Sequence, residues 1–123
     1  MKITKIAFNA YPAKNAAKLL AFYRDVMGLR VDRAYPSEED AQLVEFDIGG
    51  DHWFTLMPEA MLERPAGSGA GVVFEVDDVD GMLEKVRPHA KSADDKAAEY
   101  PSCRMASFED PEGNKVSLHS IHV

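Results

Sequence analysis

The sequence predicts an α+β fold made of two tandem modules of the same plan, within a single domain of 123 residues. Three observations lead to this prediction. Stretches rich in β-branched and aromatic residues indicate strands, and one helical stretch follows the first strand of each half. A segment rich in proline and small residues, at about 58–70, separates the halves as a linker. Two copies of one plan can pair their sheets about a pseudo-two-fold axis.

The first module, at about residues 1–57, is predicted to have the order β-α-β-β-β. Residues 3–11 are typical of a strand. The helix is expected over 15–28, because Asn15 is a candidate N-cap, the apolar residues recur at helical spacing, and Gly28 supplies a C-terminal stop. Three further strands are expected at 29–35, 41–49 and 52–57, the last two joined by the turn GGD.

The second module, at about residues 71–123, repeats this plan. A strand at 72–77 leads into a short helix at 77–87, whose start at Asp78 matches the helix start of the first module. The polar stretch 88–102 has room for a short edge strand. A hairpin across the turn DPEGN closes the chain, with Gly113 at a positive φ and strands at 104–109 and 115–121.

Composition excludes several classes of partner. The chain has 14 Lys and Arg against 21 Asp and Glu, a net charge of −7, which disfavours nucleic acid and anionic membranes. It has no apolar stretch long enough to span a bilayer. Cys103 is the only cysteine, so no intramolecular disulfide can form, and we expect a cytoplasmic protein.

Three motifs in the predicted order carry a family resemblance: AFYRDVMGLRV (21–31), VVFEVDDVDGMLEKV (72–86) and FEDPEGNKVSLHS (108–120). Together they resemble the vicinal oxygen chelate superfamily, which includes glyoxalase I, extradiol dioxygenases and the bleomycin resistance proteins. The resemblance covers nearly the whole chain. It implies two βαβββ modules whose sheets curl around a cleft, commonly in a homodimer. In metal-dependent members, a divalent ion in that cleft chelates two neighbouring oxygens of the substrate.

The resemblance also assigns four metal-ligand positions, two in each module. In this sequence they are occupied by Phe8, Thr55, Gly71 and Ser117. A phenyl ring and a glycine offer no ligand atom in a side chain, and neutral hydroxyls are poor ligands compared with imidazole or carboxylate. We therefore expect a cleft with no metal and no other cofactor.

The same cleft is expected to have an apolar, aromatic lining suited to a flat ligand, although these side chains could equally belong to an ordinary core. The candidate ligand-binding residues are Phe8, Trp53, Thr55, Met57, Ser117 and His119.

Two side chains are candidates for acid/base catalysis, His119 and Glu75. The alternative for Glu75 is a solvated position at a strand end. His119 and His122 should point to opposite sides of a strand and so make a poor metal pair. Solvent exposure is the simpler expectation for His52, and a surface ion pair for Arg104.

Three functions remain open. The first is a metal-free protein of the bleomycin-resistance type, which binds a small molecule in a dimeric cleft. The second is a metal-independent enzyme using His119 or Glu75, and the third is a metal-dependent lyase, isomerase or dioxygenase. The sequence does not separate the first two, nor does it identify the ligand. We expect a homodimer, because pairing would cover open sheet edges.

Overall fold

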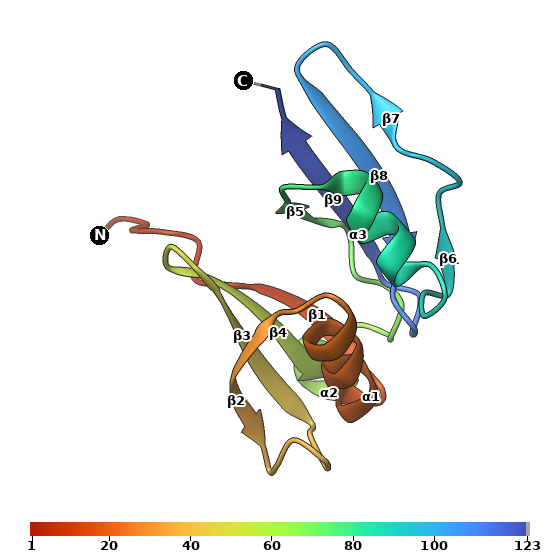
Figure 1. Cartoon of the computed structure of the whole chain (residues 1–123). Helices are drawn as coiled ribbons and strands as arrows, with labels where there is room; N and C mark the ends of the chain where they lie inside the picture. The colour runs from red at the N-terminus through yellow and green to blue at the C-terminus, as the bar shows by residue number, and fades with distance from the viewer. Residues whose placement is uncertain (123) are drawn as a thin grey trace.

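The computed structural model describes residues 1–122 and confirms the α+β fold with two sheets, each covered by a helix (Figure 1). None of the helices in these residues is long and apolar enough to cross a membrane. In chain order the elements are β1 (Asn9–Ala13), α1 (Ala16–Ala21), the π-helix η1 (Phe22–Val26), β2 (Arg30–Tyr35), β3 (Leu43–Gly49), β4 (His52–Pro58), α2 (Glu59–Leu62), β5 (Val72–Glu75), α3 (Val79–Val86), β6 (Ser92–Ala93), β7 (Ala98–Glu99), β8 (Cys103–Glu109) and β9 (Lys115–Ile121).

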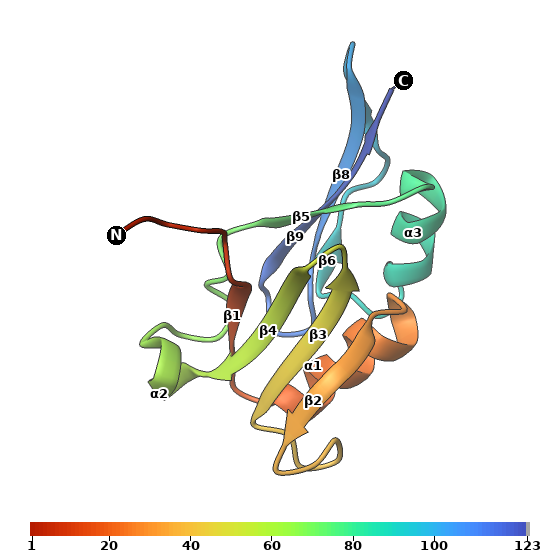
Figure 2. The same cartoon turned by 90° about the vertical axis from the view of Figure 1, so that its left-hand side faces the viewer.

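The first sheet has the strand order β1-β4-β3-β2, with β1 parallel to β4 and the other pairs antiparallel. Figure 2 looks onto this sheet, with α1 behind it. Side chains alternate along β4: Phe54 and Leu56 are buried against the helix, whereas Trp53, Thr55 and Met57 lie on the opposite face. We call this opposite side the uncovered face of the first sheet.

The second sheet has the order β5-β9-β8-β6, and the short strand β7 also pairs with β8. The polar stretch 88–102 thus contributes two short strands, β6 and β7, where the sequence suggested one. Along β9, Val116 and Leu118 are buried in the core, and Ser117 and His119 lie on the uncovered face. In the parallel pairing of β5 with β9, Glu75 lies beside His119.

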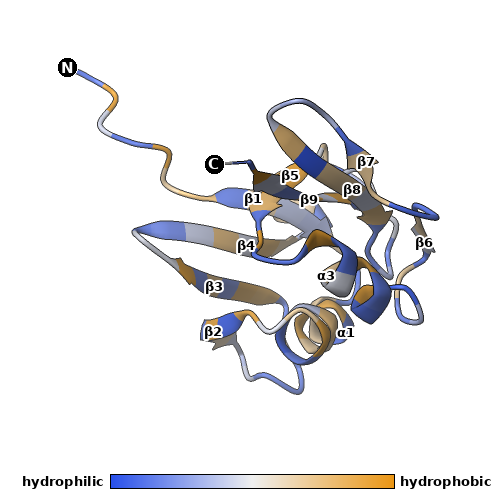
Figure 3. Cartoon of the chain, turned by 45° about the horizontal axis from the view of Figure 1, so that its top comes forward, coloured by the Kyte–Doolittle hydropathy of each residue, from blue (hydrophilic) through white to orange (hydrophobic). Residues whose placement is uncertain are grey.

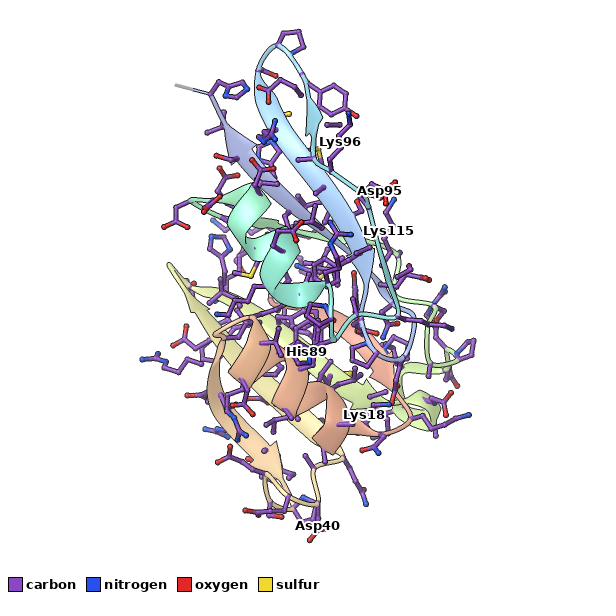
Figure 4. All side chains as sticks on the ribbon, turned by 45° about the vertical axis from the view of Figure 1, so that its right-hand side comes forward. Lys18, Asp40, His89, Asp95, Lys96 and Lys115 are labelled. Carbon is purple, nitrogen blue, oxygen red and sulfur yellow. The ribbon has the colours of Figure 1, made fainter. Side chains whose placement is uncertain are left out.

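One core joins the two modules. Both helices pack on the same side of the molecule, α1 over the first sheet and α3 over the second (Figure 4). Phe22 contacts Phe108 across the modules, with ring centroids 6.0 Å apart, and Phe54 contacts Phe74 at 5.5 Å. The apolar sides of both sheets therefore face one common core.

Two polar contacts fasten the modules at the ends of their strands. The Tyr11 hydroxyl accepts hydrogen bonds from the backbone N–H groups of Gly71, at 3.1 Å, and Val72, and it donates to the carbonyl of Lys115. The carboxylate of Glu112 accepts from the backbone at the start of the first helix, at residues 14 and 15, over 2.8 and 2.6 Å. Backbone groups of each module are thus hydrogen-bonded to side chains of the other.

The strand predicted over 3–11 is wrong in its first part, because β1 begins only at Asn9. The parallel register pairs Asn9 with Phe54, and β4 itself begins at His52. Residues before 7 therefore have no neighbouring strand in the chain. Residues 1–8 instead form an extended, exposed arm that runs away from the body (Figure 3). Strand-forming residues alone do not make a strand without a partner.

The first helix begins as predicted and changes geometry half-way. The Asn15 side chain accepts from the N–H of Lys18 at 3.1 Å, which confirms the N-cap. After Ala21 the helix widens into η1, where the Met27 N–H bonds to the carbonyl of Phe22, five residues earlier, at 3.2 Å. The wider turn accompanies burial of the consecutive rings of Phe22 and Tyr23. The predicted linker holds one further feature, the single-turn helix α2.

Candidate ligand-binding site

A cavity of about 460 Å³ lies on the uncovered face of the first sheet. Its apolar lining includes Trp53 and Met57 from β4 and Phe8 from the arm, and Thr55 lies between the two β4 side chains. Thr55 is only 3% exposed, Trp53 and Met57 are half-buried, and Phe8 is 46% exposed. We call this cavity the first-sheet pocket. Four of the six residues proposed from the sequence meet in it.

Charged side chains that the sequence analysis missed surround the first-sheet pocket: Lys5, Asp32, Arg33 and Glu45. The Arg33 guanidinium donates to the Tyr35 hydroxyl at 3.3 Å, and this bond raises the pKa of Arg33. Glu45 pairs with Arg33 on one neighbouring strand and with Thr55 on the other. Alternation within one strand cannot connect Glu45 on β3 with Thr55 on β4, so only the strand pairing shows that Glu45 adjoins the pocket.

The uncovered face of the second sheet is polar. The Ser107 and Ser117 hydroxyls lie 2.8 Å apart on β8 and β9, and Ser117 is only 5% exposed. His119 Nδ1 lies 2.5 Å from Glu75 Oε1, and Glu75 Oε2 accepts from the Ile121 N–H at 3.0 Å. The bond with His119, followed by that from Ile121, lowers the pKa of Glu75.

The pair of Glu75 and His119 remains accessible, since their side chains are 58% and 27% exposed. The Glu75 carboxylate at Nδ1 fixes the orientation of the His119 ring. The other ring nitrogen, Nε2, has no hydrogen bond to any residue from 1 to 122. The arrangement can hold or move a proton at Nε2. We refer to Glu75, Ser107, Ser117 and His119 together as the polar face.

One chain does not bring the six candidate residues together. The lining of the first-sheet pocket comes entirely from the first module, whereas Ser117 and His119 lie on the polar face. Both sheets direct their buried sides toward the common core, so each uncovered face lines its own part of the surface. Within a chain, Ser117 and His119 are therefore apart from the other four.

The remaining residues noted in the sequence have simpler surroundings. His52 is exposed, as expected. Arg104 forms ion pairs with Asp80 at 2.8 Å and Glu99 at 2.6 Å, in agreement with the surface alternative. His122 also contacts Glu99, so His119 and His122 bind different carboxylates.

The four positions assigned to metal ligands do not fit a divalent metal. The phenyl ring of Phe8 and Gly71 supply no donor, and the hydroxyls of Thr55 and Ser117 belong to different sheets. Residues 1–122 contain no group of three or more His, Cys, Asp or Glu side chains arranged to hold a metal ion. The absence of a metal nevertheless stays a prediction.

Comparison with known families decides the relationship of the chain. The model of the Glyoxalase/Bleomycin resistance protein/Dioxygenase superfamily matches residues 5–118. The chain belongs to this superfamily. The match covers both modules, including most of the strand that carries Ser117. No curated protein matches the sequence.

Solved structures of superfamily members share the fold over almost their full length. An antibiotic-binding protein, TnmS3, from Streptomyces sp. CB03234 has a TM-score of 0.78 at 23% identity, with 99% of each chain covered. A lactoylglutathione lyase from Agrobacterium tumefaciens has a TM-score of 0.71 at 24% identity, covering 97% of this chain and 95% of that one. The fosfomycin resistance protein FosX from Listeria monocytogenes has a TM-score of 0.72 at 15% identity, with 97% and 94% covered. At such identities the likeness shows the fold, and these proteins differ in activity.

Proposed function

We propose that this superfamily member binds a flat, largely apolar or aromatic small molecule in the first-sheet pocket. The observation that carries the proposal is the half-buried Trp53, which lines a cavity of about 460 Å³ together with Phe8 and Met57. Pockets for drug-sized ligands measure roughly 300–1,000 Å³ and are mostly apolar with a few polar groups. The antibiotic-binding and resistance proteins of the same fold support a role in binding small molecules.

The proposed binding does not use a metal. The residues at the four expected ligand positions lack imidazole and carboxylate groups, and Gly71 and Phe8 have no donor atom in a side chain. Elemental analysis of the purified protein should find no stoichiometric zinc, nickel, iron or manganese. About one tightly held ion per chain would overturn this part of the proposal and would favour a metal-dependent lyase, isomerase or dioxygenase.

We also propose a homodimer, and the arm supplies the main support. Ile3 and Ile6 are 94% and 80% exposed, and they lie in a strand-forming sequence without a strand neighbour. On the second module, Val73 and Ile121 are 51% and 57% exposed near the polar face. Burial of such residues by a second copy is favourable and would protect open edges. In this dimer, the polar face of one copy completes the first-sheet pocket of the other.

Tryptophan fluorescence provides the direct test of binding. Trp53 is the only tryptophan of the chain and lines the first-sheet pocket, so a ligand bound in this pocket should change its emission. Native mass spectrometry of freshly purified protein should first identify compounds that remain bound, and titration of those compounds should change the emission. Binding without any change in Trp53 emission would place the ligand elsewhere and overturn the proposed site.

A second candidate function rests on the 2.5 Å contact between His119 and Glu75. A metal-independent lyase or isomerase could use His119 Nε2 as a general base while Glu75 holds the ring. The test is to incubate the co-purified compound with the protein and to follow its mass and its isomer by chromatography. Conversion that stops in His119→Gln and persists in His52→Gln would favour the enzyme, whereas an unchanged compound would favour binding alone.

A further inference from the structure

The charges around the first-sheet pocket are unevenly paired. Lys5 Nζ lies 2.8 Å from Asp51, and Arg33 Nε lies 3.8 Å from Asp32. Arg33 also lies across from Glu45 on the neighbouring strand, and the charge of Glu45 contributes to raising the pKa of Arg33. Glu45 has no ion pair and no side-chain hydrogen bond with any residue from 1 to 122, although it is half-buried. Two cations, Lys5 and Arg33, and two carboxylates, Asp32 and Glu45, line the pocket, and Asp51 contacts Lys5 from beside it. With Asp51 included, the carboxylates outnumber the cations by one, and Glu45 is the carboxylate without an ion-pair contact.

This carboxylate without an ion pair belongs to the pocket wall itself. Glu45 lies directly across from Thr55, the most buried residue of the lining, and Trp53 is two residues from Thr55 on the same face. An ionised carboxylate that loses water beside aromatic rings raises the free energy of the complex unless a cation accompanies it. An apolar neutral ligand would remove that water and offer nothing in exchange.

The same surroundings favour a cation. Aromatic faces attract cations within about 6 Å of the ring centre, and a carboxylate opposite the ring adds a charge-assisted hydrogen bond. Trp53 and Glu45 offer both partners in one cavity. The net charge of −7 also raises the concentration of cations near the surface, which assists their capture.

We propose that the ligand class of the first-sheet pocket is a flat aromatic molecule bearing a positive charge, with Glu45 as the residue that selects for the charge. This inference rests on the proposed function, since it specifies the ligand of the same pocket. Phe8, Trp53 and Met57 bind the ring system, and the carboxylate of Glu45 binds the cationic group.

The test compares three probes built on one ring system: 10-methylacridinium, which is cationic, acridine, which is neutral at pH 8, and acridine-9-carboxylate, which is anionic. Affinities are measured at pH 8 by equilibrium dialysis and by quenching of Trp53. The expected preference for 10-methylacridinium over acridine is about 10-fold or more, with the carboxylate weakest. Glu45→Gln should reduce this preference to about twofold or less, because 10-methylacridinium loses its charge partner and acridine no longer covers an ionised carboxylate, so that acridine binds as well as before or better.

Asp95→Asn is the matched control, because it removes the same charge from an exposed position in the second module (Figure 4). Asp95→Asn should keep the preference for 10-methylacridinium over acridine. Circular dichroism of both variants should match that of the parent protein. Equal binding of the three probes, or a preference that survives Glu45→Gln, would overturn the charge selection while leaving aromatic binding intact. Loss of preference in Asp95→Asn as well would assign it to net charge and also overturn the role of Glu45. If none of the three probes binds, both the charge selection and the proposed binding of aromatic molecules in the first-sheet pocket are overturned.

Discussion

The uncovered faces of the two sheets differ in chemistry although the modules share one plan. On the first sheet, Trp53 and Met57 line an aromatic pocket, whereas the second sheet presents the polar face with Ser117 and His119. The helix-facing sides are alike, since both are apolar and fully buried in one core. Packing constrains the buried side of each sheet, and the uncovered side is free to take on different chemistry. The duplicated fold thus offers one surface for an apolar ring and another for hydrogen bonds.

The largest expected effect comes from separating the two faces. If the dimer brings the polar face of one copy to the first-sheet pocket of the other, deletion of residues 2–7 should convert the dimer entirely to monomer, because it removes the exposed Ile3 and Ile6. Light scattering at micromolar concentration measures the mass. Tyr100→Ala, which alters a 50% exposed ring in the second module, should remain dimeric. A full-length protein that is already monomeric would contradict the proposed assembly.

The next effect concerns the first-sheet pocket alone. Trp53→Ala should weaken binding of a flat ligand such as 10-methylacridinium by about 1–3 kcal/mol, because it removes apolar and stacking area. Equilibrium dialysis measures the affinity, since the variant lacks the fluorescent reporter. Tyr100→Ala should bind as the parent protein does. Equal affinity of the parent protein and Trp53→Ala would show that Trp53 does not contribute to binding, and would contradict a binding site in the first-sheet pocket.

A smaller effect is expected on the polar face. Ser117→Ala should lower the free energy of unfolding by about 0.5–1.5 kcal/mol, because its hydroxyl bonds to that of Ser107 at 2.8 Å. Its effect on ligand affinity should be smaller than that of Trp53→Ala. Urea denaturation gives the stabilities. The double variant with Ser107→Ala should be less destabilised than the sum of the two single variants, and simple additivity would show that the hydroxyls do not interact.

The smallest effect is a shift in titration on the polar face. Contact with His119 lowers the pKa of Glu75, so the pair contributes stability above the ordinary glutamate pKa and loses it as pH falls through the lowered value. Carbon-detected NMR should show Glu75 titrating below the ordinary range, and at a higher pH in His119→Ala. An unchanged Glu75 midpoint in that variant would assign the lowering to the Ile121 N–H alone.

Local sequence was sufficient wherever the interactions are local. Asn15 and Asp78 cap the two helices, and each accepts a hydrogen bond from the N–H three residues later. Gly113 has φ +91° in the turn DPEGN, and β9 spans 115–121 as predicted. Caps, turns and hairpins involve groups a few residues apart, so their residue types predict them.

The candidate site was predictable only in part. Alternation along β4 correctly places Trp53, Thr55 and Met57 on one side of a strand. The same rule gives no information on Glu45, which reaches the pocket through pairing of β3 with β4. Glu75 and His119 are 44 residues apart, and only the parallel register of β5 with β9 places them in contact.

The sequence by itself determined the two-module plan, the helix starts, the turns and the superfamily, because each depends on neighbouring residues or on motif order. Tertiary structure decided that residues 1–8 form an arm, that the first helix continues as the π-helix η1, and that the candidate residues divide between two faces. A strand needs a neighbour for its backbone hydrogen bonds, and a site needs side chains from different strands in register. Both conditions are set by pairing between segments distant in the chain, which no local pattern encodes.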